Sequence, residues 1–147
     1  MRNNLDCPVD FVKVNENRVR LVATMVLTLA FICSITANWL IPAFLFIDFA
    51  LRAFNLNTYS PLAIIAGMII KLFDIKNKPV DRAPKRFAAF IGLGFMAMIL
   101  LSLFGGFTTI AKVLLIIIMV FAALESLAGF CAGCYVYTYL KRLGLTK

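Results

Sequence analysis

Apolar residues follow one another along this chain in four long stretches, separated by short charged or turn-forming segments. The stretches occupy residues 19–37, 39–54, 87–104 and 108–139. A helix needs roughly 20 apolar residues to cross the hydrocarbon core of a bilayer. The pattern therefore predicts an all-α membrane protein with four transmembrane helices, the second short and the last longer than the core requires.

A shorter apolar segment, residues 61–73, lies between the second and third stretches. Pro61 suits the first turn of a helix, because that turn does not need the missing N–H. Apolar runs of about 10 to 14 residues more often lie in the membrane interface or re-enter it than cross it. We therefore expect a short interfacial or re-entrant amphipathic helix here.

The composition supports a membrane protein and argues against a soluble one. Hydrophobic residues make up 63% of the 147 positions, whereas a soluble domain is typically about 45 to 50% apolar. At this length we expect one integral membrane domain over residues 1–147, with its apolar surface covered by lipid or partner subunits.

The basic residues are distributed asymmetrically about the predicted spans. One side would carry Arg2, Lys13, Arg18, Arg20, Arg52, Lys71, Lys76, Lys78, Arg82, Lys85, Arg86, Lys141, Arg142 and Lys147, and the other side only Lys112. Positive charge is retained on the cytoplasmic side, so both termini are predicted to be cytoplasmic. The net charge of +8 has no interleaved aromatic surface for reading bases, so we expect anionic lipid headgroups as partners and not nucleic acid.

Two cysteines near the end of the last stretch, Cys131 and Cys134, are three residues apart and would share one side of a helix. Cys7 is predicted to lie on the same, cytoplasmic side. The leading hypothesis is a thiol redox or sulfur-relay protein in which one helix cysteine attacks, the other resolves, and Cys7 is their exchange partner. A cytoplasmic thiol or sulfur-transfer protein is the external partner that this hypothesis expects. The alternative is close helix packing through small residues, since Gly129 and Gly133 flank the pair.

An ionisable residue within a predicted span costs free energy, so it needs an ion-pair partner or a functional role. Asp48 has Arg52 one helical turn away, whereas Glu125 has no basic residue within a turn and must be neutral, reach a basic group on another helix, or face water. Glu125 is thus a candidate for proton handling, and Arg52, Lys85 and Arg86 are candidates for holding a thiolate or an anionic sulfur species. In the alternative function, Asp48, Arg52 and Glu125 line a polar path in an oligomeric transporter or channel subunit.

Two further possibilities concern metals and partners. Cys7, Cys131 and Cys134 together offer three soft ligands that suit Cu(I) or Zn(II). The chain has no histidine, which excludes imidazole catalysis and mixed His/Cys metal sites, and no other cofactor is expected. A non-catalytic subunit whose small-residue helix faces bind another membrane protein, or a second copy, is also open.

Several short motifs occur together along the chain. They are Cys7-Pro8, Val14-Asn15-Glu16-Asn17, Asp48 with Leu51-Arg52-Ala53, Ser60-Pro61, Lys78-Pro79, Ala83-Pro84-Lys85-Arg86-Phe87, and Gly129-Phe130-Cys131-Ala132-Gly133-Cys134. In this combination the chain resembles the small integral membrane family catalogued as domain of unknown function 4395, over nearly its whole length. The resemblance implies a multi-pass protein of the bacterial inner membrane with four spans. It implies no activity, so whether the protein is an enzyme is left open.

Overall fold

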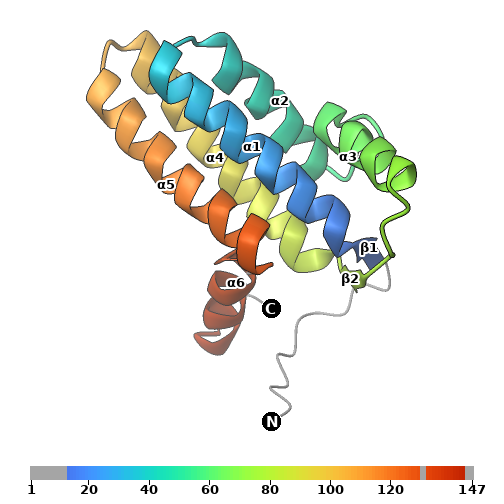
Figure 1. The fold of residues 1–147 in the computed structure, drawn as a ribbon. Helices are drawn as coiled ribbons and strands as arrows, with labels where there is room; N and C mark the ends of the chain where they lie inside the picture. The colour runs from blue at the N-terminus through green and yellow to red at the C-terminus, as the bar shows by residue number, and fades with distance from the viewer. Residues whose placement is uncertain (1–12, 130–131, 145–147) are drawn as a thin grey trace.

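The computed structural model describes residues 13–129 and 132–144, and the fold is mainly helical (Figure 1). Its elements, in chain order, are β1 (Lys13–Asn15), α1 (Glu16–Thr36), α2 (Leu40–Ala53), α3 (Pro61–Leu72), β2 (Pro79–Asp81), α4 (Ala83–Phe104), α5 (Thr108–Ala128) and α6 (Ala132–Arg142).

Four helices, α1, α2, α4 and α5, pack into an antiparallel bundle. α1 contacts α2 and α5, and α4 contacts the same two helices, so that α1 and α4 lie diagonally opposite. The core includes Ala30, Leu45, Met96, Ile99 and Leu115, all of which are buried. The short α1–α2 and α4–α5 turns lie at one end of the bundle, and β1, β2 and α6 lie at the other (Figure 1). The starts of α1 and α4 and the ends of α2 and α5 therefore meet at the same end.

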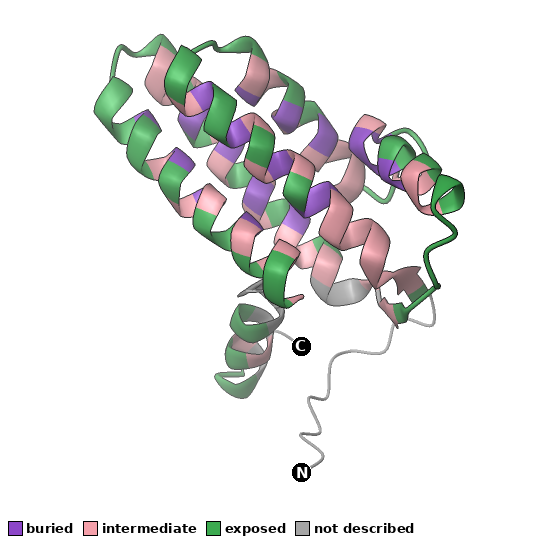
Figure 2. Ribbon diagram, in the orientation of Figure 1, coloured by how far each residue is buried: buried purple, intermediate pink, exposed green. Residues whose placement is uncertain are grey.

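The outer surface of the bundle is apolar, as a membrane protein requires. Buried residues face the interior of the bundle and exposed residues cover its outside (Figure 2), and the exposed set includes Phe31, Ile35, Leu101, Phe104 and Leu127. Within the described residues, α1, most of α4, and α5 are each long and apolar enough to span a bilayer. These features indicate a membrane protein with three candidate spans.

α2, the expected second span, has 14 residues. At 1.5 Å per residue it is about 21 Å long, which is less than the roughly 30 Å of a hydrocarbon core. The role of α2 as a fourth span stays a prediction.

The helix expected between α2 and α4 is present as α3. Ser60 caps α3 by accepting a hydrogen bond from Ala63 N at 3.3 Å. Its place in the membrane interface stays a prediction as well.

The single helix expected over residues 108–139 was wrong, because two helices occupy this range. α5 ends at Ala128, and Gly129 follows in the left-handed region with φ of 63°, a conformation that glycine adopts without steric cost. Arg20 satisfies the last carbonyls of α5, donating from Nε to Ser126 O at 3.2 Å and from Nη2 to Leu127 O at 2.6 Å. α6 begins at Ala132.

A two-stranded antiparallel sheet, which the expected all-α class did not include, joins the start of α1 to the start of α4. Val14 pairs with Val80 at its centre. Beside it, Lys78 Nζ lies 2.9 Å from Glu16 Oε2, and Asn17 Nδ2 donates to Lys76 O at 2.8 Å. Strands of three residues carry too little alternation to be detected in a sequence.

Candidate functional site

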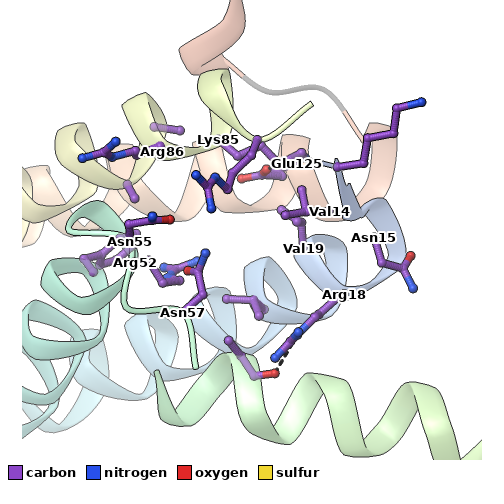
Figure 3. A pocket seen from close by; sticks show the side chains of 17 residues that line it. Val14, Asn15, Arg18, Val19, Arg52, Asn55, Asn57, Lys85, Arg86 and Glu125 are labelled. Carbon is purple, nitrogen blue, oxygen red and sulfur yellow. Dashed lines mark hydrogen bonds and ion pairs between the residues drawn. The ribbon is translucent and has the colours of Figure 1, made fainter. Parts of the chain in front are cut away.

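A cavity of about 290 Å³ opens at the end of the bundle where α1 and α4 begin and α2 and α5 end (Figure 3). We call it the basic cavity, because the described side chains that line it include six cations and one carboxylate. The cations are Lys13, Arg18, Arg52, Arg82, Lys85 and Arg86, the carboxylate is Glu125, and the amides are Asn15, Asn55 and Asn57.

Asp48 lies behind one wall of the basic cavity and is wholly buried. Its Oδ2 lies 3.0 Å from Arg52 Nε, which confirms the ion pair expected from their spacing. Its Oδ1 accepts hydrogen bonds from Ser60 Oγ at 2.6 Å and from Leu62 N at 3.3 Å. The carboxylate thus sits at the N-terminus of α3, where the helix dipole favours a negative charge. Asp48 joins α2 to α3 and orients Arg52.

Arg52 presents a buried donor at the cavity wall. Its guanidinium carbon lies 4.5 Å from the centre of the Phe49 ring, and its side chain is 17% exposed. Within the described part of the chain, its Nη2 atom is buried and has no hydrogen-bond acceptor. A buried guanidinium donor without an acceptor is costly. A negatively charged group in the cavity would satisfy it.

Glu125 finds its basic partner on the neighbouring helix. Lys85 Nζ of α4 lies 3.5 Å from Glu125 Oε1 of α5, and the two side chains are 15% and 21% exposed. This is one of the three arrangements open from the sequence. A separation of 3.5 Å is long for a charged hydrogen bond, so the Lys85 ammonium is only loosely held.

Two further arginines are fixed at the cavity wall by backbone carbonyls. Arg86 Nε donates to Ala53 O at 2.8 Å, at the last residue of α2. Arg18 Nε donates to Ala63 O at 2.9 Å, as the dashed line in Figure 3 marks. Both guanidinium groups are positioned before any ligand binds, which lowers the entropy that binding must overcome.

The structure brings together one part of the predicted site. Arg52, Lys85, Arg86 and Glu125 line a single cavity, and Asp48 supports it from behind. Sequence reasoning counted Lys13, Arg18 and Arg82 only as flanking charges and missed Asn55 and Asn57. The available signal was two polar side chains within five residues of Arg52.

The predicted thiol site is not placed by the structure. Cys7 and Cys131 lie outside the described residues, and Cys134 lies in the first turn of α6. Cys33, expected to serve packing, is buried within α1. Among the described residues, no three Cys, Asp or Glu side chains gather as metal ligands, and the soft-metal hypothesis depends on cysteines beyond them.

Comparison with known families gives one match. The family model described as "Domain of unknown function (DUF4395)" matches residues 14–142. The matched range holds every residue that lines the basic cavity except Lys13. No curated protein and no solved structure matches the chain.

Proposed function

The chain belongs to the family described as domain of unknown function (DUF4395), and from its geometry we propose that it is a membrane protein that binds an anionic group in the basic cavity. One observation carries the proposal. Six cationic side chains surround a cavity of about 290 Å³ together with a single carboxylate, and a buried donor of Arg52 lacks an acceptor there. The proposal includes four spans, with α2 as the second, and a cytoplasmic location for this end of the bundle.

The side chains, rather than the helix dipoles, supply the positive potential. α1 and α4 present their positive N-terminal ends to the cavity, but α2 and α5 present their negative C-terminal ends, so the dipoles largely offset one another. Four of the cations, Arg18, Arg52, Arg82 and Lys85, are partly shielded from bulk water, whereas Lys13 and Arg86 are exposed. Charge interactions in a partly shielded site are several times stronger than at an open surface. Guanidinium groups match the geometry of phosphate, sulfate and carboxylate oxygens. A phosphate or sulfate group is the class of ligand that fits best.

A membrane anchor is the simpler explanation for basic residues at a helix end. Lipid headgroups attract exposed Lys and Arg side chains, and such an anchor needs no cavity. Arg52 and Lys85, however, are more than four-fifths buried as side chains. Burial of this kind costs free energy that an exposed anchor does not require, so an internal anion explains their positions better.

The test is the affinity for methyl phosphate, measured by titration calorimetry in nanodiscs of zwitterionic lipid. The double variant Asp48→Asn/Arg52→Gln removes the guanidinium and its buried counter-charge together, so that no unpaired charge is left behind. We expect its affinity to fall roughly 10- to 100-fold, since hydrogen bonds to charged groups contribute about 1.5 to 3 kcal/mol.

Lys112→Gln is the matched control, because Lys112 lies in the first turns of α5, at the opposite end of the bundle. It should bind methyl phosphate as the wild type does. Unchanged affinity for methyl phosphate in Asp48→Asn/Arg52→Gln would reject the basic cavity as the binding site. An equal loss of affinity in Lys112→Gln would show that the net charge of the protein, and not the basic cavity, determines binding.

Thiol chemistry at Cys131 and Cys134 is a second candidate function, favoured by the helix break at Gly129. Because α6 begins at Ala132, Cys134 lies near a helix N-terminus and not, as expected, toward the C-terminal end of one long helix. A helix N-terminus favours the thiolate form that exchange reactions need.

Alkylation mass shifts in whole cells test the thiol function. Oxidant should convert Cys131 and Cys134 to a disulfide, and sulfide added afterwards should open that disulfide to one persulfide and one thiolate. We expect neither change at the buried Cys33, which is the internal control. A Cys131→Ser/Cys134→Ser variant should lose the shift. Cysteines that stay reduced and unmodified under every condition would reject the thiol function.

A further inference from the structure

A second cavity, of about 320 Å³, adjoins the basic cavity and extends deeper into the bundle. We call it the apolar cavity, because its lining is apolar except for Arg52 and Glu125. The residues found in its wall alone are Ala23, Val26, Ile91, Gly92, Phe95, Ile118, Phe121, Ala122 and Val136. All four helices of the bundle and α6 contribute to its wall, and two of the lining residues, Phe121 and Val136, are also exposed at the outer surface.

The two cavities share a wall. Val19, Phe49, Arg52, Ala88 and Glu125 line both of them. Arg52 and Glu125 therefore lie at the boundary between the basic cavity and the apolar cavity. A ligand that passes Arg52 would occupy both cavities.

The apolar cavity has the depth of a short aliphatic chain. From Val19 at the shared wall to Val26, α1 advances seven residues, or about 10 Å at 1.5 Å per residue. Phe95 and Phe121 border it on the α4 and α5 side, with ring centres 6.5 Å apart in an edge-to-face arrangement. Away from Arg52 and Glu125, the lining side chains offer water no hydrogen-bond partner, so hydrocarbon fills this part of the cavity favourably.

We propose that the anion is the head group of an amphiphile with a single aliphatic chain: the phosphate-type head occupies the basic cavity and the chain occupies the apolar cavity. This proposal rests on the anion-binding function and adds the substrate class. The bilayer itself can supply such a molecule as lysophosphatidic acid, an acidic lipid with one acyl chain, and the cytoplasm can supply it as a soluble alkyl phosphate or acyl phosphate. Both carry the same anionic head on the same kind of chain.

The experiment extends the methyl phosphate titration to butyl and hexyl phosphate, with empty nanodiscs subtracted to remove partition into lipid. We expect the affinity to rise by about fourfold per methylene, the fold-change that corresponds to burying one CH₂ group. Val26→Phe fills the apolar cavity and should flatten the series without changing the affinity for methyl phosphate. Val113→Phe, on an exposed face of α5, is the matched control and should leave the rise intact.

The outcomes separate the two proposals. A flat series with normal methyl phosphate binding overturns the amphiphile and leaves the anion-binding function standing. Absence of methyl phosphate binding overturns both. A rise that persists in Val26→Phe also overturns the proposal, because the chain then lies elsewhere. Competition identifies the source of the ligand. Lysophosphatidic acid, which has one acyl chain, displaces hexyl phosphate when it is placed in the nanodisc if the lipid is the ligand, and leaves hexyl phosphate bound if the ligand is soluble.

Discussion

Replacing Asp48 by asparagine is expected to lower the free energy of unfolding by about 3 kcal/mol. The substitution keeps an acceptor for Ser60 Oγ but removes the charge that faces Arg52 Nε at 3.0 Å. Breaking a buried ion pair costs about 3 to 5 kcal/mol, because the remaining charge is uncompensated. We expect the lower end, since Glu125 lines the same cavity and remains as a negative charge near the guanidinium.

Equilibrium denaturation in detergent micelles measures this loss, and the double variant Asp48→Asn/Arg52→Gln provides the control. Removing both charges should restore most of the stability that Asp48→Asn loses, because no unpaired charge is left. If the double variant were as unstable as Asp48→Asn, the loss would come from the contacts of Asp48 with α3 and not from the ion pair.

Replacing Gly92 by leucine is expected to lower the free energy of unfolding by about 1 to 3 kcal/mol, the usual cost of overfilling a packed interior. A Cβ atom at Gly92 would lie 2.4 Å from Cε1 of Phe49, inside van der Waals contact. The Phe49 ring lines both cavities, so a ring displaced by the new side chain would change their shared wall. Because Arg52 stacks on that ring, methyl phosphate binding should weaken as well.

Gly94→Leu is the matched control on the same helix, because a Cβ atom there meets nothing within 4 Å. It should be neutral or slightly stabilising, since glycine lowers helix stability by about 1 kcal/mol relative to alanine and leucine is close to alanine in helix propensity. Adding Phe49→Ala to Gly92→Leu should cost less than Phe49→Ala costs alone, as residues in contact are coupled. Equal effects at Gly92 and Gly94 would show that close packing against Phe49 is not the cause.

Local features of the site could be predicted from the sequence, because they depend on spacing along one helix. Asp48 and Arg52 are four residues apart, which places them on the same face of α2. The helix ends near Ser60, Pro61 and Gly105 also follow from the residues that cap or interrupt a helix.

Features that depend on packing between helices could not be predicted in the same way. Lys85 and Glu125 are 40 residues apart and meet only because α4 lies against α5. The end of α5 is fixed partly by Arg20, more than 100 positions earlier in the chain. Apolar periodicity gives the buried face of each helix but not the space left between four of them, so both cavities emerge only from the assembled bundle.

The location of a bound oxyanion tests the proposed function most directly. Selenate is a tetrahedral dianion whose selenium atom can be located by anomalous X-ray scattering from crystals of the full-length protein. Binding in the basic cavity predicts an anomalous selenium peak inside that cavity, with an oxygen of the same selenate within about 3 Å of Arg52 Nη2. Peaks confined to the outer surface of the bundle, with none in the basic cavity, would contradict it.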